Sequence, residues 1–249
     1  MTDLSAFRAA VAARAAAGLP APAGLPDSVG RVAPAGLPDS VGLAAPAEPP
    51  TPAGLPDSVG RVAPAGLAAL AREAGVRTAV LLEGPSDLAA VEALAGRLGR
   101  ELAAEGVCAV AMGGAMSVGP FAALLGPSGL GLRLTGLCDE HEQGFYRRGF
   151  DRAGAFGDEF FVCAADLEEE FIRALGVPRI EQVLAAAGDL PAWRTFARQP
   201  AQRDRSPQQR LRRFLGTRKG RKIRYGRLLA EALDPDRLPP PLHALFHHL

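Results

Sequence analysis

Three short apolar runs, each followed by a break and then a helical pattern, constrain the fold of this chain most strongly. They are Thr78–Leu82 (TAVLL), Val107–Met112 (VCAVAM) and Leu132–Cys138 (LRLTGLC). Apolar runs of this length without polar alternation are typical of strands that are buried on both faces of a parallel sheet. We expect helices at 86–105 and 117–125, and a fourth strand at 160–163. This alternation predicts an α/β fold in which helices flank a parallel sheet.

The rest of the chain divides by composition. A helical pattern at 1–17 precedes a segment, 18–64, in which the string AGLPDSVG occurs three times among Pro-rich stretches. Each copy contains one Leu and one Val, too little apolar surface to offset the entropy of ordering it. We therefore interpret 18–64 as a disordered Pro/Gly-rich repeat insert. Residues 65–165 would form the α/β domain, and residues 166–249 a helical, basic C-terminal region.

Several protein classes are disfavoured by the sequence. Cys108, Cys138 and Cys163 lie in apolar runs without CxxC spacing, which indicates buried thiols rather than zinc ligands or disulfides. The N-terminus has no signal-peptide pattern, and no apolar run is long enough to span a membrane. We expect a cytoplasmic protein without a membrane partner.

Acidic residues stand where the first and third predicted strands end. Glu83 follows the first strand directly, Asp87 falls in the first turn of the next helix, and Asp139 follows the third strand. If these strands are neighbours, the acids converge at the carboxyl edge of the sheet. Clustered carboxylates repel one another unless a cation neutralises them, and Mg²⁺ prefers carboxylate oxygens. The pattern predicts a Mg²⁺ or Mn²⁺ site, although Asp87 alone also fits a helix-start acid and Glu140 and Glu142 fit solvated loop charges.

The run VLLEGPSD from Val80 to Asp87, the Gly pair after the second strand and the acid after the third resemble the Toprim domain. That domain is shared by topoisomerases, bacterial primases and certain nucleases. The longer pattern, in which EGPSD precedes an apolar helix and ADLEEEFIRALG and KGRK follow later, is similar to the Toprim half of the OLD (overcoming lysogenization defect) family of endonucleases. The resemblance covers roughly 78–233. It implies a Toprim-like, Rossmannoid parallel sheet and a two-metal carboxylate site.

The resemblance also implies roles for individual residues. The implied catalytic residues are Glu83, Asp87, Asp139, Lys219 and Lys222. The implied metal ligands are Glu83, Asp87, Asp139, Glu140, Asp166 and Glu168, with Glu169 as an alternative to Glu168; acids at 166–169 also fit a helix N-terminus. Where the family has Asp-x-Asp, this chain has Asp139-Glu140-His141, and His141 is a poorer Mg²⁺ ligand. Glu140 or Glu142 could take that place through a shifted loop.

Charge is segregated along the chain. Ten acids lie between Asp139 and Glu170, whereas eleven Lys or Arg residues and one acid lie between Arg203 and Arg227. A basic segment beside an acidic site is expected of a metal-dependent enzyme that acts on a polyanion. The candidate nucleic-acid-binding residues are Arg210, Arg213, Arg218, Arg221 and Arg224. The alternative is a solvated helix that keeps the protein in solution.

We interpret the chain as a Mg²⁺-dependent endonuclease of phage defence or DNA repair, with DNA favoured over RNA as its partner. One alternative is a degenerate, non-cleaving Toprim module that binds nucleic acid as a repair or recombination adaptor. Another is a nuclease subunit that works with a separate ATPase, because OLD proteins usually carry an ATPase domain. This chain has no GxxxxGK[ST] motif, so we expect no ATP site in it. Homodimer formation stays open.

Overall fold

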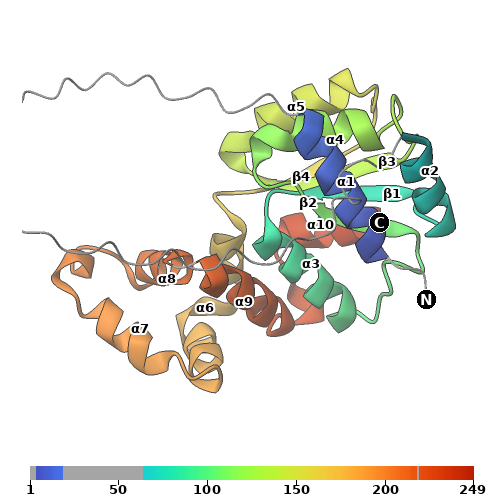
Figure 1. The fold of residues 1–249 in the computed structure, drawn as a ribbon. Coiled ribbons are helices and arrows are strands. Elements are labelled where there is room, and N and C mark those ends of the chain that lie inside the picture. Colours follow the sequence, from blue (N-terminus) through green and yellow to red (C-terminus); the bar gives the residue numbers. More distant parts are fainter. Residues whose placement is uncertain (1–3, 19–63, 218) are drawn as a thin grey trace, which may run out of the picture.

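The computed structural model describes residues 4–18, 64–217 and 219–249. The predicted insert, apart from its end residues 18 and 64, lies outside the described residues. Arg218 also lies outside them. The described elements form a four-stranded parallel sheet with helices on both faces (Figure 1). The predicted fold class is confirmed.

The sheet has the strand order β2-β1-β3-β4, with every neighbouring pair parallel. The strands are β1 (Thr78–Leu82), β2 (Val107–Ala111), β3 (Arg133–Asp139) and β4 (Phe160–Cys163). β1 has the predicted bounds, whereas β3 extends to Asp139, because this residue still pairs with Cys163 of β4. β1 and β3 are neighbours, with Leu82 beside Leu137, so the acids that follow them share one edge.

Alternate strand residues face two separate helical layers. Ala79 and Leu81 pack in one cluster and Val80 and Leu82 in the other. The first layer contains α1 (Leu4–Gly18), α2 (Pro64–Glu73), α4 (Val118–Leu125) and α5 (Gln143–Arg152). The second contains α3 (Pro85–Arg97), α6 (Leu167–Ala186), α9 (Lys219–Glu231) and α10 (Pro240–His248), and it continues into α7 (Leu190–Ala197) and α8 (Pro207–Gly216), which lie to one side of the sheet (Figure 1). Four short 3₁₀ turns connect these elements: Ala115–Ser117, Glu140–Glu142, Pro200–Gln202 and Pro235–Arg237.

The helix predicted for 86–105 ends earlier than expected. α3 stops at Arg97, because Gly99 takes a φ of 67° that a continuing helix does not allow. The following residues form turns, in which the Arg100 guanidinium pairs with Glu105 and donates a hydrogen bond of 2.6 Å to the carbonyl of Phe246. This turn thus ties the end of α3 to the C-terminal helix.

The helical C-terminal region folds back onto the sheet. α9 crosses α3 so closely that a Cβ at Gly226 would lie 2.6 Å from the carbonyl oxygen of Ser86. α10 packs on β3 and β4, with Leu242 and Leu245 fully buried. A single apolar cluster therefore contains residues of both the sheet and the C-terminal helices. No helix within the described ranges is long and apolar enough to cross a membrane. The domain boundaries stay a prediction.

Candidate metal centre

The backbone at Glu83 is fixed by the glycine pair that follows β2. The Glu83 carbonyl accepts hydrogen bonds from the backbone N–H groups of Gly113 and Gly114, each at 2.9 Å. These glycines have φ values of 80° and 129°, which side chains with a Cβ rarely allow. The double glycine thus positions the first acid of the site.

Asp87 closes the turn between β1 and α3. Its Oδ2 accepts a hydrogen bond of 2.9 Å from the backbone N–H of Gly84. Burial raises the pKa of Asp87, against the opposing effects of the Gly84 hydrogen bond and the positive charge of Lys222. Asp87 also lines a small hollow together with Glu83 and Asp139. Asp87 therefore has two positions in the structure: it caps the start of α3, and it lies beside Glu83 and Asp139.

Three carboxylates meet at the carboxyl edge of the sheet. Oxygens of Glu83, Asp139 and Glu142 lie within 4.8 Å of one another, and all three residues are partly buried. Asp139 ends β3, and Glu142 ends the 3₁₀ turn that follows. Burial, and then the negative charge of Glu83, raise the pKa of Asp139 to about 7. The same two causes raise the pKa of Glu142 to about 7.

This group fits a hard divalent cation. Glu142 Oε2 is buried and has no hydrogen-bond partner among the described residues. A buried carboxylate oxygen without a partner is destabilising, and coordination of a cation would satisfy it. An all-carboxylate set suits Mg²⁺ or Mn²⁺, whereas Zn²⁺ is usually held by Cys and His.

Comparison with known families bears on the same strands. Residues 76–140, which include β1, β2, β3 and two of the three carboxylates, match the family described as "Overcoming lysogenization defect protein-like, TOPRIM domain". Over this segment the chain is similar to OLD-like Toprim domains. The resemblance seen in VLLEGPSD is thereby confirmed.

Solved structures of OLD proteins are similar to a longer part of the chain. The C-terminal region of the Xanthomonas campestris pv. campestris OLD protein is 25% identical with a TM-score of 0.49, and the match covers 70% of this chain and 98% of that one. The C-terminal region of the Burkholderia pseudomallei OLD protein is 19% identical with a TM-score of 0.49, covering 70% and 96%. A search of curated proteins found no match.

The third carboxylate of the Toprim edge comes from Glu142 rather than from Glu140. Glu140 and His141 are both exposed, and neither belongs to the group of three. The sequence left Glu140 and Glu142 as alternatives at this point. The signal that favours Glu142 is its spacing of three residues from Asp139, which one 3₁₀ turn returns to the same side.

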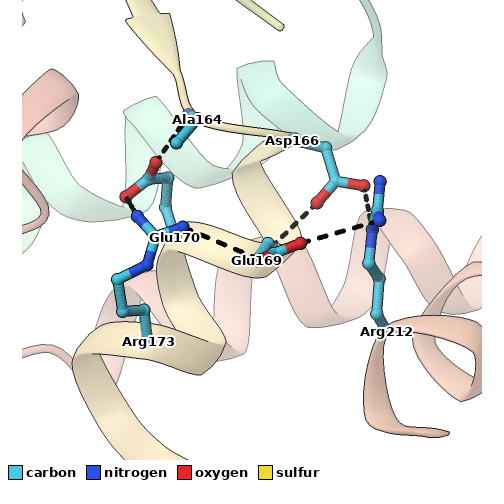
Figure 2. A network of polar contacts seen from close by, with 6 residues as sticks. All are labelled: Ala164, Asp166, Glu169, Glu170, Arg173 and Arg212. Atoms are coloured by element: carbon cyan, nitrogen blue, oxygen red, sulfur yellow. Dashed lines mark hydrogen bonds and ion pairs between the residues drawn. The ribbon is translucent and has the colours of Figure 1, made fainter. Parts of the chain in front are cut away.

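Two further predicted ligands, Asp166 and Glu168, lie at the start of α6. They are close to the group of three carboxylates, which we call the Toprim centre, but do not belong to it. Asp166 Oδ1 accepts the backbone N–H of Glu169 at 2.8 Å, while Oδ2 pairs with Arg212 Nε at 2.6 Å (Figure 2). The charge of Asp166 contributes to the raised pKa of Asp139, so the two acidic groups act on each other.

Lys222 connects the two acidic groups. Its Nζ lies 3.4 Å from Glu168 Oε1, and Glu168 is buried, which raises the pKa of that carboxyl to about 7. Burial lowers the pKa of Lys222, but the negative charges of Glu168, Asp87 and Glu83 outweigh this effect, so the pKa of Lys222 is raised. Lys222 therefore remains a cation beside the Toprim centre. Lys219 begins α9, but its side chain lies outside the described ones.

The candidate arginines of α8 face different sides. Arg213 lines a polar cleft of about 690 Å³ that also contains Asp166, Glu168 and Lys222. Arg210 instead lines a separate cleft beside α7, and its Nη2 donates to the carbonyl of Arg203 at 3.0 Å. Of these two, only Arg213 lies in the cleft that Lys222 and the acids at the start of α6 line.

The candidate arginines of α9 hold helices together. The Arg221 guanidinium lies 4.1 Å from the centre of the Phe214 ring and donates to Thr217 Oγ1 at 2.7 Å. Arg224 pairs with Asp189 at 3.2 Å and donates to a backbone carbonyl at the end of α6. These contacts join α9 to α8 and to the loop before α7.

Proposed function

We propose that this chain is a Mg²⁺- or Mn²⁺-dependent nuclease that hydrolyses phosphodiester bonds, with DNA as the favoured substrate. The observation that carries the proposal is the group formed by Glu83, Asp139 and Glu142 on an OLD-like Toprim sheet. Three carboxylates without a cation repel the phosphates of a nucleic acid, so the group can act on nucleic acid only with a cation between the carboxylates and the phosphates.

The surroundings of the acidic side chains and of Lys222 support a role in cleavage for each of them. Glu83, Asp139 and Glu142 would hold the cation, which when bound supplies positive charge to a phosphate and makes a water molecule more acidic. Lys222, kept charged by its acidic neighbours, is suited to stabilise negative charge that develops on the phosphate. Asp166 and Glu168 are the proposed carboxylates of a second cation position.

The cleft beside α8 is the proposed path for the phosphates. It adjoins Lys222 and is lined by Arg205, Arg212 and Arg213 as well as by the acids of α6. Because no GxxxxGK[ST] motif is present, we propose that this chain cleaves without ATP. The cysteines at 108, 138 and 163 are free and buried, which fits the cytoplasmic location that we propose.

A cleavage assay on plasmid and single-stranded DNA tests the proposal. We expect cleavage with Mg²⁺ or Mn²⁺, none in EDTA, and a loss of at least about a hundredfold in Glu83→Gln, comparable to the loss of other transition-state contacts. Glu140→Gln, which changes an exposed neighbouring acid, should retain activity. DNA binding without cleavage in the wild type would instead support a non-cleaving module. Cleavage only after addition of an ATPase would support the two-subunit alternative.

A further inference from the structure

Large exposed hydrophobic side chains are few in the described part of the chain. They are Met116, Phe145 and Phe156, with exposed fractions of 78%, 38% and 81%. Met116 and Phe145 follow the ends of β2 and β3, at the edge that carries the metal centre, whereas Phe156 precedes β4 and lies toward the opposite edge. Exposed apolar side chains beside a polar site are typical of a contact surface.

Phe145 is held next to the carboxylates by the packing of α5. Glu142 precedes this helix with a near-helical backbone, and a residue three positions later lies on the same side. The adjacent Tyr146 is fully buried, and its hydroxyl lies 3.1 Å from the carbonyl of Leu81 and 2.9 Å from that of Leu137. α5 is thereby anchored where β1 and β3 end, which leaves Phe145 partly exposed beside the centre.

Met116 lies on the same side of the α4–α5 contact as Phe145. A Cβ at Gly149 would meet Val118 Cγ1 at 2.6 Å, so the start of α4 touches α5 at this glycine. Phe145 is one helical turn from Gly149 toward the start of α5, and Met116 is two residues before Val118. The two exposed side chains therefore flank the same end of the contact, near the strand ends.

Arg148 adds a cation to this surface. Its guanidinium carbon lies 5.2 Å from the centre of the Phe145 ring, and its Nη1 would lie 3.0 Å from a Cβ at Gly144. The guanidinium thus lies over the first turn of α5. Within the described ranges Arg148 forms no ion pair, unlike Lys222 and Arg212 near the other acidic group. A guanidinium without a carboxylate partner is available to an anionic ligand.

We propose that Phe145, Arg148 and Met116 form a stacking platform for an unpaired nucleobase of the strand that enters the carboxylate site. This inference rests on the proposed function for the identity of the ligand. Aromatic rings and guanidinium groups stack on any base, and Arg148 carries the charge to meet an adjacent phosphate. In a duplex the bases are stacked on one another, so the platform favours single-stranded or unpaired substrates.

Binding of two labelled oligonucleotides tests the platform separately from cleavage. One is single-stranded oligo-dT and the other is an abasic strand of the same length, each titrated with the full chain at low salt, with Ca²⁺ in place of Mg²⁺ so that a hard cation occupies the carboxylates. We expect the wild type to bind oligo-dT about tenfold more tightly, as for one base stacked on an aromatic side chain. Phe145→Ala should remove most of this difference, and Phe145→Trp should keep it.

Phe156→Ala is the matched control, because it removes an exposed Phe at the other edge of the sheet. It should leave the preference for oligo-dT intact. Absent binding, equal binding of the two strands by the wild type, or the same loss in Phe156→Ala as in Phe145→Ala would overturn the platform. A base preference that depends on Phe145 in a chain that never cleaves would uphold the platform and refute the nuclease. Cleavage with base-independent binding would do the reverse.

Discussion

At the scale of single residues, protonation at the carboxylate site links folding to pH. The pKa values of Asp139 and Glu142 are raised to about 7, whereas such groups titrate near roughly 4 in an unfolded chain. Between these values the folded, metal-free chain binds more protons than the unfolded chain. Its free energy of unfolding therefore contains a contribution that is present at acidic pH and is lost as pH rises through about 7.

Asp139→Asn removes one of these charges, so it should stabilise the metal-free chain at pH 8 more than at pH 5. The gain in melting temperature at pH 8 should be about 2–4 °C for each kcal/mol relieved. Circular dichroism melts of both proteins in EDTA measure it. Mg²⁺ should raise the melting temperature of the wild type at pH 8, because it binds the folded state. A difference between the two proteins that is the same at both pH values would contradict this account.

Residue-level chemistry also shows what the sequence could and could not predict at the site. The approach of Glu83 and Asp139 was predicted from the strand ends on the condition that the two strands are neighbours, and β1 and β3 do pair in parallel. The choice between Glu140 and Glu142 depended on the turn after β3, whose geometry the spacing did not settle. The role of Arg221 depended on how α8 and α9 pack, which brings Phe214 under its guanidinium, and the role of Arg224 depended on Asp189, which lies 35 residues away in the sequence.

At the scale of elements, the crossing of α3 and α9 places Lys222 at the Toprim edge. Gly226, one turn after Lys222, has no space for a side chain against Ser86. We expect Gly226→Ala to push α9 outward, at a cost of about 1–3 kcal/mol of stability, as for other overpacked sites. Cleavage should fall further than stability explains, because Lys222 moves away from the carboxylates.

Gly220→Ala is the matched control on the same helix, because nothing lies within 4 Å of a Cβ at that position. It should be neutral or slightly stabilising, as Ala favours a helix over Gly. Denaturant unfolding and cleavage rates of the two variants make the comparison. Equal effects of the two substitutions would show that the approach at Gly226 does not position Lys222.

Sequence patterns predicted the existence of most elements but not all of their ends or their mutual angles. The strand at 78–82 had the right bounds because a buried run ends where the acid begins. α3 ended at Arg97 because Gly99 adopted a left-handed conformation, which glycine allows but does not require. The predicted basic residues of α8 and α9 have helical spacing on each helix, but Arg210 and Arg213 of α8 line different clefts, and Arg221 and Arg224 of α9 contact Phe214 and Asp189.

At the scale of the whole molecule, the sheet and the C-terminal helices share one apolar core. This core contains Val80 of β1, Trp193 of α7 and Leu245 of α10. Leu245 is fully buried, so Leu245→Ala should cost about 2–5 kcal/mol. Trp193 is the single tryptophan and reports on α7. Its fluorescence should therefore show the same lowered unfolding midpoint as circular dichroism. A tryptophan transition that keeps its wild-type midpoint would indicate separate folding units.

The most direct test of the account is calorimetric titration of the metal-free chain with Mn²⁺. The wild type, Glu142→Gln and Glu140→Gln are compared at pH 8, where the carboxyls are ionised. The account predicts that the wild type binds Mn²⁺ and that Glu142→Gln binds at least about tenfold more weakly, a loss typical for groups that support a metal. Glu140→Gln should bind as the wild type does. Absent binding by the wild type, or an equal loss in the two variants, would contradict a metal centre formed by Glu83, Asp139 and Glu142.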